Sequence, residues 1–162
     1  MELLLELMSK AANLAYDVND LMKYVDENMD ASFLDAAENG RDISKFDLKK
    51  KELVELYKKR SMSFALNDRI MLMLVELSRE EKEAIYEKLT DLINYNKKQY
   101  ASYFNEYQQV VDVITNPSFS FEGHEEYKEL IIVLKDGYNR CQSIIKYYEN
   151  IQAYLKTFVR GK

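Results

Sequence analysis

The sequence predicts an all-α protein, an elongated and mostly antiparallel four-helix bundle, from two observations. Only four glycines and one proline occur in 162 residues, about 3% of the chain against roughly 12% in average usage. A fold of many short strands needs more turn residues than that. Four long segments carry apolar residues at alternating steps of three and four, the spacing of helices packed against helices. The chain length predicts a single domain over 1–162.

The first helix is expected over about residues 2–29, followed by a short helix or turn over Ser32–Glu38. Asn39–Gly40 is a strong stop signal for that segment. The apolar positions of the first helix form one uninterrupted seam: Leu4, Leu7, Ala11, Leu14, Val18, Leu21 and Val25.

The second helix is expected to begin at Ser44. Its predicted seam consists of Ile43, Phe46, Lys50, Leu53, Tyr57, Arg60 and Phe64, with Leu56 widening the stripe. Neither Gly nor Pro occurs from residue 41 to 116, and one helix of that length would exceed ~110 Å, so a break is required. Asn67–Asp68 is one candidate, and Ser78, which forms a capping box with Glu81, is the other. The apolar run between them is either a short helix or the end of the second helix.

The third and fourth helices are the longest, over about 79–115 and 125–158. Asn116–Pro117 ends the third helix, because the residue before a proline disfavours the α region, and the loop Ser118–Gly123 follows. Two polar residues, Asn96 and Gln152, fall on the predicted seams. A polar residue on a seam commonly fixes the register of neighbouring helices.

The composition excludes most kinds of active site. No two glycines lie close enough to form a phosphate-binding loop, and a net charge of −5 disfavours a nucleic-acid partner. A di-metal site in a helical bundle needs two Glu-x-x-His motifs, whereas His124 is the single histidine. Cys141 lies on a seam, where a thiol usually acts as a small buried apolar group. We therefore expect no enzymatic activity, no cofactor and no metal.

The location expected for the protein is the cytoplasm. The segment that starts at Met1–Glu6 contains neither a basic region nor a small-residue cleavage site, so no signal peptide is predicted. The longest uncharged apolar run, Ile70–Val75, is far too short to cross a bilayer. A lone cysteine fits a reducing compartment.

Two groups of residues are candidates for binding a partner protein. Met71 and Met73 belong to an apolar run that is wider than one helix face, and methionine-rich surfaces adapt to varied partners. The alternative is that this run caps one end of the bundle and is covered on all sides. Tyr95, Tyr147 and Tyr154 fall off the predicted seams, and tyrosine is enriched at interfaces.

The charges are unevenly distributed between the first two helices. Residues 17–42 contain eight acidic and two basic side chains, whereas residues 43–60 contain seven basic and three acidic ones. These blocks could neutralise each other across an antiparallel pair. The alternative is that Lys49–Lys51 and Lys58–Arg60 form a patch for an acidic partner or nucleic acid.

Part of the chain resembles the FlgN-type flagellar export chaperones. The residues that carry the resemblance are the lysine-rich stretch from Lys50 through Leu53 and Leu56 to Arg60, a polar connector, and Asn94 and Asn96 near the middle of the long third helix. The match covers about Ser44–Ile114. Members of this family are small acidic cytoplasmic helical proteins that hold late-secreted filament-junction subunits through their C-terminal part and deliver them to the export gate.

The sequence therefore favours a non-enzymatic helical chaperone or adaptor that binds an amphipathic or helical segment of a partner protein, as a flagellar (type III) export chaperone would. One alternative is a structural coiled-coil homo-oligomer, whose seams join copies of the chain. Another is a small inhibitor or effector that blocks a macromolecular partner.

Overall fold

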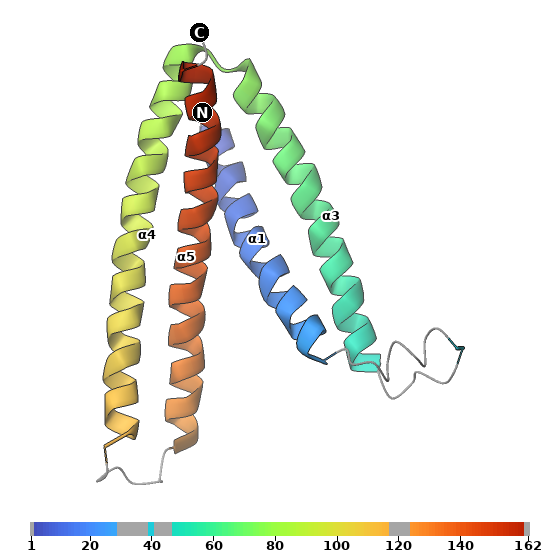
Figure 1. Cartoon of the computed structure of the whole chain (residues 1–162), viewed down its shortest axis with the longest axis vertical. Coiled ribbons are helices and arrows are strands. Elements are labelled where there is room, and N and C mark those ends of the chain that lie inside the picture. The colour runs from blue at the N-terminus through green and yellow to red at the C-terminus, as the bar shows by residue number, and fades with distance from the viewer. Residues whose placement is uncertain (1, 29–38, 41–46, 117–123, 161–162) are drawn as a thin grey trace. The chain divides into compact units, whose positions relative to one another are not determined.

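The computed structural model describes residues 2–28, 39–40, 47–116 and 124–160. Those residues form four α-helices and no strand (Figure 1): α1 (Glu2–Asn28), α3 (Asp47–Glu76), α4 (Arg79–Ile114) and α5 (His124–Arg160). The predicted all-α helical class is confirmed, and the predicted ends of the first, third and fourth helices agree to within a few residues. The predictions for 32–38, for the helix start at Ser44 and for 118–123 lie outside the described residues.

The chain folds as two compact units, one over Glu2–Glu76 and one over Leu77–Lys162. The first unit contains the antiparallel pair α1 and α3, and the second contains the antiparallel pair α4 and α5 (Figure 1). At 36 and 37 residues, α4 and α5 are each roughly 55 Å long. The single domain expected from the chain length stays a prediction.

The chain breaks at Ser78, the second of the two predicted positions, and α3 runs without interruption through Asn67 and Asp68. The side-chain amide of Asn67 donates to the carbonyl oxygen of Ser63 at 2.9 Å, so it bonds within its own helix. The predicted break at Asn67–Asp68 is therefore wrong, and residues 70–76 are the end of the second helix.

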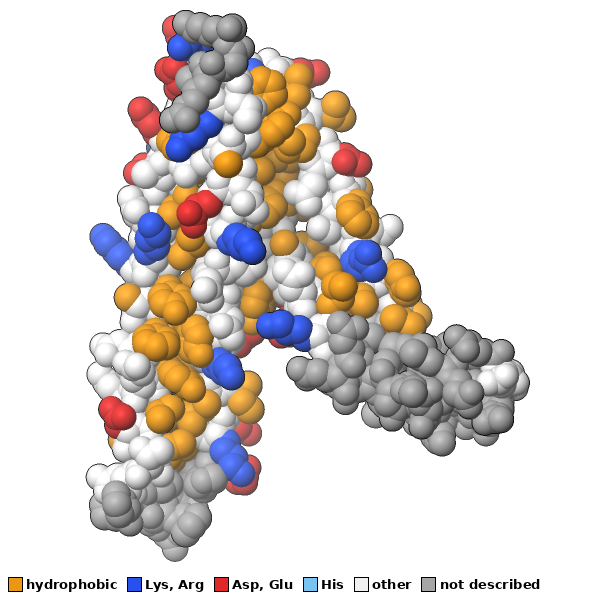
Figure 2. Space-filling view, in the orientation of Figure 1, with side chains coloured by type: hydrophobic (Ala, Val, Ile, Leu, Met, Phe, Trp, Pro, Cys, Tyr) orange, Lys and Arg blue, Asp and Glu red, His pale blue; other side chains and the backbone are white. Residues whose placement is uncertain are grey.

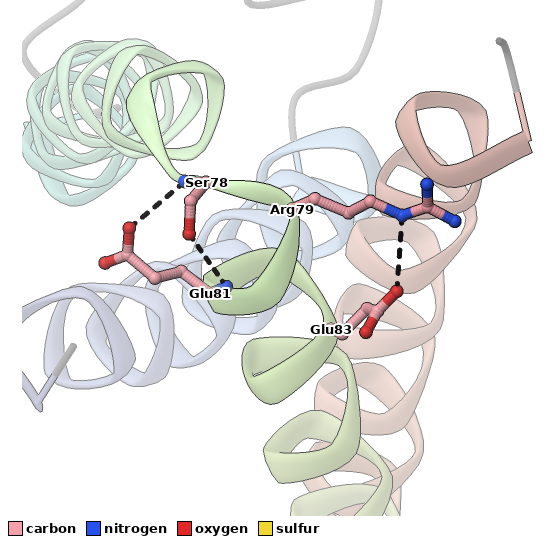
Figure 3. Close-up of polar contacts among 4 residues, drawn as sticks. All are labelled: Ser78, Arg79, Glu81 and Glu83. Carbon is pink, nitrogen blue, oxygen red and sulfur yellow. Dashed lines mark hydrogen bonds and ion pairs between the residues drawn. The ribbon is translucent and has the colours of Figure 1, made fainter.

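Ser78 ends one helix and starts the next through a capping box (Figure 3). Its φ of −67° and ψ of 165° place it in the extended region. The backbone N–H of Glu81 donates to Ser78 Oγ at 3.1 Å, and the backbone N–H of Ser78 donates to Glu81 Oε1 at 3.1 Å. Two otherwise unpaired N–H groups at the start of α4 are thereby satisfied. Arg79 Nε and Glu83 Oε1 form an exposed ion pair at 3.5 Å one turn on.

The capping box makes stability depend on pH in a predictable direction. The backbone N–H of Ser78, followed by its hydroxyl, lowers the pKa of Glu81 below its usual 4.5. A carboxyl whose pKa is lower in the folded state stabilises the fold above the unfolded value, and that contribution is lost as the pH falls through the lowered pKa. We expect Glu81→Gln to reduce the urea midpoint at about pH 6 and to have a smaller effect at about pH 3. Glu80→Gln, exposed in the same turn, is the control. A Glu81→Gln effect that is constant with pH would contradict the prediction.

The core of the first unit is formed by one face of each helix. Its buried side chains are Leu4, Leu7, Met8, Ala11 and Ala12 of α1 and Leu56, Ile70 and Leu74 of α3. The seam predicted for α1 is confirmed at Leu4, Leu7 and Ala11. The seam predicted for the second helix is wrong at two of its aromatic positions, because Tyr57 and Phe64 are exposed.

The core of the second unit includes Cys141, which the sequence predicts on a helix seam. Its buried side chains are Ile85, Leu89 and Ile93 of α4 and Leu134, Cys141, Tyr148, Ile151 and Leu155 of α5. Further along the hairpin, Tyr138 of α5 meets the rings of Tyr100, Phe104 and Tyr107 of α4 at centroid distances of 5.4–5.7 Å. Burial, followed by the neighbouring Tyr107 and Tyr100, raises the pKa of Tyr138.

Gln152, one of the two polar seam residues, joins α5 to α4. Its side-chain amide donates to the carbonyl oxygen of Tyr86 at 3.0 Å and to Thr90 Oγ1 at 2.7 Å. Asn96 instead donates to the carbonyl oxygen of Leu92 in its own helix, at 2.8 Å. Gln152 therefore makes a register contact between α4 and α5, whereas the side-chain bond from Asn96 to Leu92 is internal to α4.

Gly137, the one glycine inside a described helix, makes room for a ring of the other helix. A Cβ atom built on Gly137 would lie 2.7–3.0 Å from Cδ1, Cε1 and Cγ of Tyr103. Because an aromatic ring has no flexible end to move aside, any larger residue at this position would force α4 and α5 apart or displace Tyr103.

Candidate partner-binding surface

An exposed row of apolar side chains follows α3 along most of its length (Figure 2). It consists of Val54, Tyr57, Phe64, Leu72 and Val75, which we call the α3 row. Tyr57, Phe64 and Leu72 are 60%, 65% and 69% exposed, respectively. Single exposed apolar residues are common in soluble proteins, whereas several on one continuous face indicate a binding surface.

The spacing of the α3 row is that of a helix seam. Its members recur at steps of three, seven or eight residues, and the exposed Ser61 and Asp68 fill the two longer steps. At about 100° per residue, all seven positions fall within one side of the helix. The buried residues Leu56, Ile70 and Leu74 lie on the opposite side. Helix α3 therefore carries two seams, one packed inside its hairpin and one exposed.

A small hollow adjoins the α3 row inside the same hairpin. It measures about 160 Å³ and is lined by Ala15, Val18 and Asn19 of α1 and by Arg60, Ser63 and Phe64 of α3. The guanidinium carbon of Arg60 lies 5.9 Å from the ring centroid of Tyr57, within the range of a cation–π contact. The hollow gives an apolar side chain of a partner a place to insert beside Phe64.

Cations outnumber anions beside the α3 row, although Asp68 lies within the row and Glu76 lies on its flank. Lys51, Lys58 and Arg69 share one flank, are exposed or half-exposed, and take part in none of the ion pairs found among the described residues. Glu55 is paired within α3, because its Oε1 lies 4.0 Å from Lys59 Nζ. The surface therefore complements a helix that carries acidic residues beside its apolar stripe.

Met71 and Met73, the two methionines predicted to bind a partner, are both half-buried on α3. They point to nearly opposite sides of the helix, because two residues turn it by about 200°. The strongly exposed apolar residues of their segment are Leu72 and Val75, which sequence reasoning did not select. The excess of apolar residues over one face was the signal that could have found them.

Tyr95, Tyr147 and Tyr154 lie in the other unit. Tyr95 is exposed on α4, whereas Tyr147 and Tyr154 are half-buried on α5. Burial, followed by the neighbouring Tyr148, raises the pKa of Tyr147 to about 12. The ring of Tyr154 packs edge-on against the ring of Phe158, with 4.9 Å between the two ring centroids. Of the three predicted tyrosines, Tyr95 presents the most surface to a partner.

Candidate nucleophiles and metal ligands are few among the described residues. Burial raises the pKa of the Cys141 thiol, which makes it a poor nucleophile at neutral pH. No group of three or more His, Cys, Asp or Glu side chains is placed to hold a metal ion in the described part of the chain. The side chain of His124 lies outside the described residues. Among the described helices, none combines the length and apolarity needed to span a membrane.

No protein-family model matches the sequence, and comparisons with curated proteins and with solved structures found no match either.

Proposed function

We propose that this protein is a non-enzymatic helical chaperone or adaptor that binds an amphipathic helix of a partner protein along the α3 row. The observation that carries the proposal is an exposed row of apolar side chains with the spacing of a helix seam. A partner helix with apolar residues at steps of three and four would complete that seam. Burial of a side chain the size of Phe64 or Leu72 contributes about 1.5–3 kcal/mol.

Flagellar export is the setting that we propose for this activity, on the resemblance over residues 44–114. An export chaperone must cover an apolar segment of its client until the client is delivered, and the α3 row lies within the resembling stretch. A structural homo-oligomer is the alternative that the same row supports, because a heptad-like seam also joins copies of one chain.

Photo-crosslinking in the native host tests the proposal directly. We would place p-benzoylphenylalanine at Phe64 or Leu72, in the α3 row, and at Ile132 of α5 as the control. Ile132 is 67% exposed and belongs to the other unit. We expect a discrete crosslinked product at the two row positions and none at Ile132, with a crosslinked peptide that is an amphipathic helix of another protein.

Affinity measurements with a synthetic copy of the crosslinked segment complete the test. Phe64→Asp and Leu72→Asp should each weaken binding at least about tenfold, whereas Ile132→Asp should leave it within about twofold. Equal crosslinking at Ile132 and Phe64 would overturn the proposal. A product formed between two copies of this chain, with a dimer seen by light scattering, would establish the homo-oligomer instead.

A further inference from the structure

A second apolar surface lies on the other unit, at the end of the hairpin where α4 stops and α5 begins (Figure 1). It is a groove of about 290 Å³, which we call the hairpin groove. Its lining is Glu106, Gln109, Val110 and Val113 of α4 and Tyr127, Leu130 and Leu134 of α5. We propose that the hairpin groove binds a short amphipathic helix with basic residues beside its apolar stripe.

The shape of the hairpin groove fits a helix. On both sides the lining covers about two turns of one helix face, from Glu106 to Val113 and from Tyr127 to Leu134, which is about 10 Å of helix. Two antiparallel helices thus present parallel ridges, and a third helix packs into the groove between such ridges. Two turns of a partner would bring apolar side chains at i, i+3 or i+4, and i+7 onto the lining.

The apolar lining is open to solvent along this groove. Val113 is 45% exposed and Leu130 is 42% exposed, while Leu134 is buried at its floor. Val133, three residues beyond Leu130, is 61% exposed and continues the apolar surface outward. These side chains have apolar area left to bury against a partner.

The charge around the groove is acidic on both helices. Glu106 belongs to the lining itself, and Glu126 lies one turn before Leu130 on α5. Both are exposed, and neither takes part in an ion pair among the described residues. On α5, Lys128 points about 100° around the helix from Tyr127. Its Nζ lies 3.5 Å from Glu125 Oε1, with which it forms an ion pair. A partner with Lys or Arg on each side of its apolar stripe therefore meets one carboxylate on each rim.

The hairpin groove is independent of the α3 row. The two surfaces lie on different units, and their borders have opposite charge, so they would select different partner helices. A chaperone or adaptor with both surfaces could hold an acidic amphipathic helix on α3 and a basic one on the α4–α5 hairpin.

Two labelled peptides of equal length test the assignment with the full chain carrying Phe64→Asp, which weakens binding at the α3 row. Both carry leucines at i, i+3, i+4 and i+7; one has Lys and Arg at the flanking positions and the other has Glu. We expect fluorescence anisotropy to show about tenfold tighter binding of the basic peptide at low salt, and a smaller preference at high salt. Glu106→Lys combined with Glu126→Lys should reverse the preference.

Matched variants locate the bound peptide. Leu130→Asp and Val113→Asp should each weaken binding of the basic peptide at least about tenfold. Ile132→Asp is the control, because Ile132 is exposed on the same helix but lies outside the groove lining. Circular dichroism verifies that all three variants keep their helices.

Three other outcomes would show that the basic peptide does not bind in the hairpin groove. Equal affinity of the Phe64→Asp chain for the two peptides, or unchanged binding of the basic peptide by Leu130→Asp, would overturn the inference. Loss of binding by Phe64→Asp and not by Leu130→Asp would show that the basic peptide uses the α3 row. Because the function proposed above is tested by crosslinking at α3, failure of the groove would leave that result unchanged.

Discussion

Replacing Asp68 by proline is expected to destabilise the α1–α3 hairpin by about 3 kcal/mol or more. Asp68 is exposed in the interior of α3, so the loss would come from the backbone. Proline removes the N–H that bonds four residues back, and its ring clashes with the carbonyl group of that turn. Urea denaturation followed by circular dichroism measures the loss, and hydrogen exchange should show it as reduced protection in α3.

Arg79→Pro is the matched control, because it places the same residue at the break that the structure shows. Arg79 is the first residue of α4, where the N–H has no partner within the helix and proline is favoured. The extended conformation of Ser78 is the one that a residue before proline prefers. We expect a change within about 1 kcal/mol, including the lost ion pair with Glu83. If Asp68→Pro left the free energy of unfolding unchanged and Arg79→Pro lowered it by several kcal/mol, the helix break would lie at Asn67–Asp68.

The position of this break shows which local signals in the sequence can be trusted. Ser78 and Glu81 satisfy two backbone N–H groups reciprocally, and that pairing needs a helix start to form. Asn67 has no such requirement, because its amide can bond to the preceding turn of an uninterrupted helix. A reciprocal cap therefore located the end of α3, and a polar pair did not.

The packing of α3 could be predicted only in part. A period of 3.6 residues identifies the faces of a helix, but it does not say which of two apolar faces is covered. The predicted seam through Tyr57 and Phe64 is an apolar face, yet the neighbouring helix packs on the side of Leu56 and Leu74. In the α4–α5 hairpin, by contrast, Cys141 was predicted to lie on a helix seam and is buried.

The candidate surfaces were less predictable than the fold for a related reason. Met71 and Met73 were chosen by residue type, whereas exposure is set by the angle at which each position meets the neighbouring helix. Leu72 lies between them and is exposed. The hairpin groove combines α4 and α5 residues that are at least 14 positions apart in the sequence, so only the pairing of the two helices brings Val113 near Tyr127.

The second large effect is expected in the core of the α4–α5 hairpin. Leu89 has no exposed surface, and truncation of a fully buried leucine loses its transfer free energy and leaves a cavity. We expect Leu89→Ala to lower the free energy of unfolding of this hairpin by about 2–5 kcal/mol. Urea denaturation followed by circular dichroism measures the loss, and hydrogen exchange of α4 and α5 assigns it to this unit.

Ile132→Ala is the matched control for Leu89→Ala, since it removes a similar volume from a side chain that is 67% exposed in the same unit. We expect it to change stability by no more than about 0.5 kcal/mol, because little apolar area returns to water and alanine favours the helix. A loss equal to that of Leu89→Ala would mean that Ile132 is covered in solution. It would then belong to an interface, and Ile132→Asp could no longer serve as the control for the hairpin groove.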